Sequence, residues 1–249
     1  MKYFLIALLI VSAGVASADD FEAVEAKLKS ALAADIRTDA ERERDRNRRP
    51  VDTLKFFGLR DDMKIVELLP GGGWYTKLLV PVVRDNGEYY AALGTGNISR
   101  NLLAEPGFED MQIIATDSEV YRKDGARLYT LETTGLGVTD MDMVLTFRNY
   151  HNFDAEGRAA MNKAAFDALK SGGVYAVVDH TRRHMEGDNP ENRRRIDPVL
   201  AIHEIEAAGF KFVDFSDLHY RADDELRYEV GRKTVTGNTD RWTLKFVKP

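Results

Sequence analysis

The stretch Ile65-Val66-Glu67-Leu68-Leu69-Pro70-Gly71-Gly72-Gly73-Trp74-Tyr75-Thr76 indicates the fold of this chain. An apolar run containing one acid ends at a proline and three glycines, and residues 74–83 then carry apolar side chains at helical spacing, interrupted by Pro81. A strand, a glycine turn and a helix begin a doubly wound α/β domain, whose ligand lies at the carboxyl end of the first strand. Glycine lets the backbone approach that ligand closely, and the start of the helix offers free N–H groups.

The spacing of the glycines helps to distinguish possible ligands. Dinucleotide enzymes use G-x-G-x-x-G, and here Gly71 and Gly73 fit the first two positions while Thr76 occupies the third. Glu67 lies at the end of the predicted strand, where a buried acid is costly unless it bonds to backbone N–H groups or ligand hydroxyls. A glycine turn that binds nothing is the alternative, because isolated glycine motifs are weakly specific.

Composition indicates a soluble globular protein with one large or two small domains, since the 249 residues are 44% hydrophobic and 31% charged. The formal charge of −6 and the pI of about 5.5 argue against nucleic acid as the main partner. The chain has no cysteine, which excludes thiolate catalysis and thiolate metal sites. A chain of this length can be stabilised by its core without disulfides.

The N-terminus has the pattern of a secretory signal peptide. Lys2 precedes an apolar run over 3–15, and Ala16-Ser17-Ala18 then forms an A-x-A cleavage site before Asp19. The apolar run is too short to span a bilayer comfortably, and no lipoprotein cysteine follows it. We therefore expect residues 1–18 to be removed, giving a free periplasmic or secreted protein with no membrane association. An N-terminal anchor or buried helix is the alternative.

An N-terminal helical extension is expected over residues 19–60. Apolar spacing predicts a helix over 21–34, and Pro50 begins another that ends at Gly58. Between them, 37–49 mixes arginines with acids. This segment is either a solvated, salt-bridged helix or a source of arginines that fold over the ligand pocket, the candidates being Arg46, Arg48 and Arg49.

Residues 61–249 alternate between strand and helix patterns, which predicts an α/β domain with a mostly parallel sheet and helices on both faces. The predicted strands are 64–69, 88–93, 111–115, 141–147, 174–178, 210–215 and 241–247. Besides the helix over 74–83, the predicted helices in this part are 155–169 and 198–208, and Ser171-Gly172-Gly173 is predicted to be the turn before the fifth strand.

Four stretches together resemble the class I S-adenosylmethionine-dependent methyltransferases: 66–76, 144–152, 169–175 and 239–242. The runs T-F-R-N-Y-H-N-F and V-V-D-H, with the signal peptide, are similar to a group of exported, predicted methyltransferases. The resemblance covers residues 50–249. It implies a Rossmann-like seven-stranded sheet with the last strand antiparallel, and an S-adenosylmethionine pocket above strands one, two and four.

The resemblance also implies a set of cofactor contacts. Glu67 and the three glycines would approach the methionine and ribose, and Asp117 would take the adenine amino group. The end of strand two departs from the family pattern. In the family it usually carries an acid that binds the ribose hydroxyls, whereas here the strand runs into Gly94-Thr95-Gly96-Asn97. Thr95 or Asn97 would then have to form the hydrogen bond to the ribose. An NAD enzyme would lack the same acid as well as the third glycine. The expected contacts are Glu67, Pro70, Gly71, Gly72, Gly73, Tyr75, Thr95, Asp117, Arg148 and Asn149, with Tyr75 alternatively a core residue.

Methyl transfer needs alignment in a desolvated pocket, and a general base helps when the acceptor carries a proton. His151 and His180 follow strands four and five at the ligand edge, with Asp179 adjacent, so these three residues are the predicted catalytic group. The alternative is a pair of structural histidines that bond to loop backbone. His180 and His184 have helical spacing suited to a metal, but the segment is predicted to be a loop, so we expect no metal.

These features predict an exported methyltransferase acting on an unidentified small-molecule acceptor. S-adenosylmethionine is made in the cytoplasm, and a fold can persist while its site takes another use. A non-catalytic methyltransferase-like periplasmic domain that binds a small ligand or a protein partner is therefore the alternative. The sequence leaves the oligomeric state open.

Overall fold

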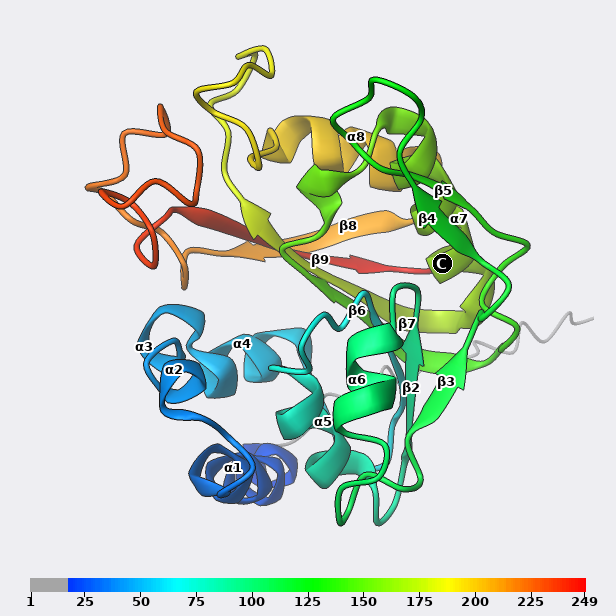
Figure 1. Ribbon diagram of the computed structural model, residues 1–249. Helices are drawn as coiled ribbons and strands as arrows, with labels where there is room; N and C mark the ends of the chain where they lie inside the picture. Colours follow the sequence, from blue (N-terminus) through cyan, green and yellow to red (C-terminus); the bar gives the residue numbers. More distant parts are fainter. Residues whose placement is uncertain (1–17) are drawn as a thin grey trace, which may run out of the picture.

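The computed structural model describes residues 18–249 (Figure 1). The first helix, α1, covers Ala18–Ala33. The predicted signal peptide and its export function lie outside the described residues, except for Ala18. Within 18–249, no helix combines the length and apolar character needed to cross a membrane.

The described residues form a seven-stranded sheet in the order β3-β2-β1-β6-β7-β9-β8. The pairs from β3 to β7 are parallel, whereas β9 is antiparallel to both of its neighbours. This confirms the predicted Rossmann-like sheet with its last strand antiparallel. The strands are β1 Lys64–Leu68, β2 Glu88–Ala92, β3 Gln112–Ile114, β6 Met141–Phe147, β7 Leu169–His180, β8 Lys211–Ser216 and β9 Arg241–Val247.

Helices cover both faces of the sheet, as Figure 1 shows. Successive residues of a strand face opposite sides, so Ile65 packs in one core and Val66 in the other. The first core includes side chains of α1, α4 (Pro50–Phe57), α5 (Thr76–Val83) and α6 (Gly96–Asn101). The second core includes side chains of α7 (Ala155–Ala168) and α8 (Pro198–Ala207).

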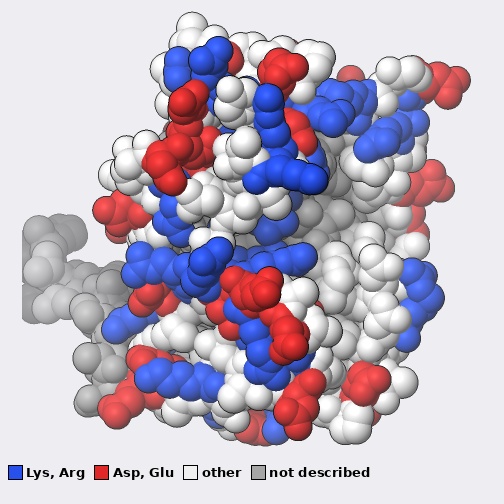
Figure 2. Space-filling model, turned by 60° about the vertical axis from the view of Figure 1, so that its left-hand side comes forward, with Lys and Arg blue, Asp and Glu red and all other residues white. Residues whose placement is uncertain are grey.

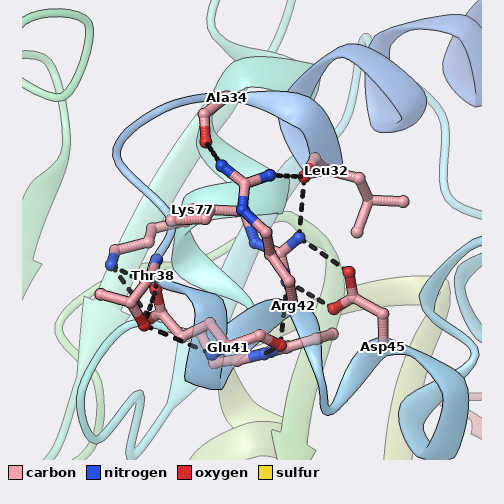
Figure 3. A network of polar contacts seen from close by, with 9 residues as sticks. Leu32, Ala34, Thr38, Glu41, Arg42, Asp45 and Lys77 are labelled. Atoms are coloured by element: carbon pink, nitrogen blue, oxygen red, sulfur yellow. Dashed lines mark hydrogen bonds and ion pairs between the residues drawn. The ribbon is translucent and has the colours of Figure 1, made fainter.

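The segment 37–49 forms two short helices, α2 (Asp39–Arg42) and α3 (Asp45–Arg48), so the prediction of one helix was wrong. Thr38 starts α2 through a capping box with Glu41. Figure 3 shows how this turn is fixed, with Arg42 donating to the carbonyls of Leu32 and Ala34 at 3.0 and 2.9 Å.

The extension is joined to the sheet domain by a shared core and by polar contacts. Leu28 of α1 and Phe57 of α4 lie in the same core as the side chains of α5. The Lys77 ammonium of α5 donates to both carboxylate oxygens of Glu41 at 2.9 Å (Figure 3). These contacts hold α2 and α3 beside the carboxyl end of β1.

Three local features differ from the predictions. The short strands β4 (Glu119–Tyr121) and β5 (Thr130–Glu132) pair antiparallel, and neither they nor α6 were predicted. The predicted turn 171–173 lies inside β7 as an irregularity, because Met141 pairs with Leu169 while Met143 pairs with Val174. Backbone bonds between Lys248 and residues 172 and 173 keep this segment attached to the neighbouring strand.

Candidate functional site

The glycine turn after β1 is open to its surroundings at two of its three glycines. A Cβ placed on Gly71 or Gly72 would meet nothing within 4 Å, and of these two only Gly71 has a positive φ, of 59°. Gly73 is different, because its Cβ would lie 2.5 Å from the Cδ1 of Leu102. Gly71 and Gly72 therefore leave room for a ligand, whereas Gly73 allows the turn to pack against the end of α6.

A cavity of about 230 Å³, here called the turn cavity, lies over this glycine turn. It is lined by seven of the predicted cofactor contacts: Glu67, Pro70, Gly71, Gly72, Tyr75, Arg148 and Asn149. The Asn149 amide donates to the Leu69 carbonyl at 3.1 Å, which ties the end of β6 to the turn. The Tyr75 ring stacks on Phe147 with centroids 3.5 Å apart, so Tyr75 is both buried and part of the cavity wall.

Three predicted cofactor contacts do not line the turn cavity. Gly73 is buried against α6, and Thr95 is the residue before the first turn of α6. Asp117 is exposed and accepts a hydrogen bond from the Thr134 hydroxyl at 3.2 Å. Their roles in binding a cofactor remain predictions.

A second cavity of about 250 Å³, here called the arginine cavity, shares Arg44, Arg48 and Arg148 with the first. It lies between α3, the end of β7 and the loop 230–239, and its wall includes His180, Thr239 and Arg241. Figure 2 shows this side of the molecule, where basic side chains gather around a hollow. Because they share these three arginines, the two cavities are adjacent, and together they are here called the cleft at the carboxyl edge of the sheet.

Glu67 is a buried acid in the wall of the turn cavity. The hydroxyls of Thr76 and Tyr89 donate to its Oε2 at 2.8 and 2.6 Å. The expected need for bonding partners is therefore met by side-chain hydroxyls. Burial raises the pKa of Glu67 to about 7, despite these two hydrogen bonds and the nearby Arg48.

Glu67→Gln is expected to change how stability depends on pH. The folded protein holds a proton on Glu67 up to about pH 7, whereas the unfolded chain loses it near 4.5, so the wild type loses stability as pH rises through this interval. The full interval corresponds to about 3 kcal/mol. Urea unfolding of both proteins across the interval measures the difference. Parallel profiles would show that Glu67 ionises normally.

His151, Asp179 and His180 are brought together as one group. The Nδ1 of His151 lies 2.5 Å from Asp179 Oδ1, and the backbone N–H groups of His151 and His180 donate to the same carboxylate at 2.8 and 2.6 Å. The two imidazole rings are 5.6 Å apart. Asp179 is fully buried, and it holds His151 in the 3-10 turn after β6 and His180 at the end of β7.

Only one of these histidines reaches the cleft wall. His180 lines the arginine cavity, and its Nδ1 lies 2.9 Å from the Thr239 hydroxyl. Burial, followed by repulsion from Arg241 and other basic neighbours, holds the pKa of His180 well below its usual value. His180 is therefore neutral and has a ring nitrogen able to accept a proton, while His151 lies behind it.

The remaining histidines have structural or surface positions. His184 is exposed and pairs with Asp197 at 2.9 Å, and His203 is exposed on α8. His219 is buried between the Arg48 carbonyl at 2.9 Å and the Thr243 hydroxyl at 2.6 Å. Within residues 18–249, no group of three or more acidic or histidine side chains is arranged to hold a metal.

Several cleft residues were not predicted from the sequence. Arg44, Arg241 and Thr239 line the arginine cavity but were not predicted as site residues. Of the three arginines proposed to fold over the pocket, Arg48 lines both cavities and the other two line neither. The arginine density of 37–49 was the available signal, but it did not specify which side chains turn inward.

No family model and no curated protein matches this chain. Solved structures do share its fold. A SAM-dependent methyltransferase from Aquifex aeolicus is 16% identical, with a TM-score of 0.57 over 90% of this chain and 98% of that one. The [4+2]-cyclase SpnF is 15% identical, with a TM-score of 0.54 over 92% and 93%. The glycopeptide N-methyltransferase MtfA complexed with sinefungin is 14% identical, with a TM-score of 0.51 over 80% and 91%. At these identities the similarity shows a methyltransferase-type fold.

Proposed function

We propose that this protein is an S-adenosylmethionine-dependent methyltransferase that acts on a small-molecule acceptor. The observation that carries the proposal is the open turn at Gly71 and Gly72, at the carboxyl end of β1 and under a cavity lined by Glu67. Ligands of doubly wound folds bind at this edge of the sheet. The methyltransferases among the structural neighbours support the choice of cofactor, including one complexed with sinefungin.

The cleft residues fit such a cofactor in a defined way. The bare backbone of Gly71 and Gly72 leaves space beside the turn, Glu67 offers a carboxyl group, and Arg44 and Arg48 offer positive charge to a cofactor carboxylate. When bound, S-adenosylmethionine supplies a methyl group whose bond to sulfur breaks as the bond to the acceptor forms, leaving S-adenosylhomocysteine. The protein then has to align the acceptor and remove its proton.

His180 is the candidate general base because it is neutral and lines the arginine cavity. A hydroxyl or protonated amine of the acceptor would lose its proton to this ring as the new bond forms. Asp179 and His151 are positioning residues, since the Asp179 carboxylate holds the backbone of His180 and the ring of His151.

Export is part of the proposal, supported by the signal pattern of residues 1–18. Cleavage after Ala18 would leave Asp19 as the first residue. Sequencing the N-terminus of protein recovered from outside the cytoplasm tests this, and an intact N-terminus there would contradict it.

A non-catalytic domain that binds a small ligand is the second candidate function. The observation that favours it is the end of β2, where Leu93, Gly94 and Thr95 bring no carboxylate into the turn cavity. Such a domain would bind a nucleoside-like ligand but would not transfer a methyl group. Binding and turnover therefore have to be measured separately.

Calorimetric titration of the protein with S-adenosylmethionine and S-adenosylhomocysteine tests the cofactor assignment. We expect a dissociation constant tighter than about 1 mM, which corresponds to about −4 kcal/mol. NAD is the matched control, because the chain lacks the third glycine and the strand-two acid that favour it. Weaker binding than this, or equal binding of NAD, would count against the proposed function.

A further inference from the structure

The arginine cavity concentrates positive charge without matching negative charge. Arg44, Arg48, Arg148 and Arg241 all line it, and among residues 18–249 none of the four forms an ion pair with a carboxylate. Arg194, a fifth arginine in the wall, pairs with Glu229. The protein as a whole is acidic, so this local excess of positive charge is opposite in sign to its net charge of −6.

Two of these guanidinium groups are deeply buried. Arg48 is 8% exposed and Arg241 is 6% exposed. The Nε atoms of Arg48, Arg148 and Arg241 are buried and have no hydrogen-bond partner among the described residues. An unpaired buried charge or donor is costly, so an anion that accepts from these groups would gain interactions that the free protein lacks.

The arginines are held in place from separate parts of the chain. The Arg48 guanidinium lies 4.2 Å from the centre of the Trp74 ring, and its own backbone carbonyl is 2.9 Å from the His219 ring. Arg241 pairs with His180 in the sheet and donates from one terminal nitrogen to the Asn47 carbonyl at 2.7 Å. The cluster is therefore preorganised before any ligand arrives.

The acidic side chains near these arginines already have other hydrogen-bond or ion-pair partners. Asp179 accepts from the His151 ring and from two backbone N–H groups, and Glu41 is paired with Lys77. Burial, followed by repulsion from Arg148, lowers the pKa of Arg48 to about 9 and that of Arg241 to about 10.

We propose that the arginine cavity binds a carboxylate or phosphate group of the methyl acceptor, placing the acceptor beside His180. Planar guanidinium groups suit both anions because they donate two parallel hydrogen bonds. This inference rests on the proposed function, since it assigns the turn cavity to the cofactor and the arginine cavity to the acceptor. It names the substrate class as anionic small molecules.

The test uses inorganic phosphate and succinate as probes, with thermal unfolding and calorimetry of the full chain in the presence and absence of saturating S-adenosylhomocysteine. We expect at least one probe to bind and to raise the melting temperature in both conditions. Arg148→Gln and Arg241→Gln should weaken this binding by about tenfold or more. Arg60→Gln is the matched control, because Arg60 pairs with Asp62 before the start of β1, away from the cleft, and it should leave binding unchanged.

The unliganded arginine variants also have to be shown to be folded. The melting temperature of each unliganded variant is measured first, and a loss of anion binding in a variant that unfolds near the wild-type temperature supports the proposal. Absence of binding by both probes, or binding that survives both arginine variants, would overturn it. Anion binding that disappears with S-adenosylhomocysteine would assign the anion to the cofactor carboxylate and overturn the acceptor site. Anion binding without any cofactor binding would count against the proposed function alone.

Discussion

Gly72→Val is expected to abolish cofactor binding while leaving the protein folded. Gly72 lies in the wall of the turn cavity, has no positive φ, and has nothing within 4 Å of the position that a Cβ would take. A valine there adds its side chain to open space without backbone strain, and it occupies the volume assigned to the ligand. We expect the affinity for S-adenosylhomocysteine to fall by roughly 100-fold or more, about 2.8 kcal/mol, as measured by calorimetry.

The control for this experiment is Gly187→Val. Gly187 also lacks a positive φ and has nothing within 4 Å of its Cβ position, but it lies in the loop between β7 and α8. Both variants should unfold at nearly the wild-type temperature, and only Gly72→Val should lose the ligand. If Gly72→Val bound S-adenosylhomocysteine normally, the cofactor would have to lie elsewhere.

His180→Asn is expected to lower the rate of methyl transfer by about 10² to 10⁴-fold. Asparagine places a polar atom close to the position of Nδ1, so the contact with Thr239 can persist, but it removes the Nε2 atom that is available to take a proton. The measurement is formation of S-adenosylhomocysteine with any acceptor that the wild type uses. The affinity for the cofactor should not change.

The pH profile separates a base from a structural residue. Because the pKa of His180 lies well below its usual value, the wild-type rate should fall only under acidic conditions, when the ring becomes protonated. His180→Asn should lose this acidic limb, whereas the exposed His203→Asn should keep both the rate and the profile. An unchanged rate in His180→Asn would remove His180 from the proton-transfer step.

Much of the fold could be predicted because its strands are buried on both faces. Residues 64–68 and 141–147 are mostly apolar and almost wholly buried, a pattern typical of parallel strands. The pair formed by β4 and β5 lacked such a signal, since each strand has only three residues within a polar segment. The turn expected at 171–173 is part of β7, because backbone hydrogen bonds to residue 248 hold this segment against the neighbouring strand.

The site could be predicted only where its residues follow strand ends. His151, Asp179 and His180 come directly after or at the end of buried strands, so their meeting follows from the sheet order. Arg48 and Arg241 are far apart in the sequence, and they share a cavity because α3 packs against β9 through the buried His219. Helical or strand periodicity carries no information on such a long-range contact.

The arginines around His180 have a consequence for the timing of proton transfer. Burial, and after it the repulsion from these arginines, keeps the imidazole a weak base in the free protein. An anion settling among them would cancel that repulsion and strengthen the base at the moment its substrate is in place. Before an anionic acceptor binds, His180 would therefore be a weak base, and it would not activate water to attack the sulfonium.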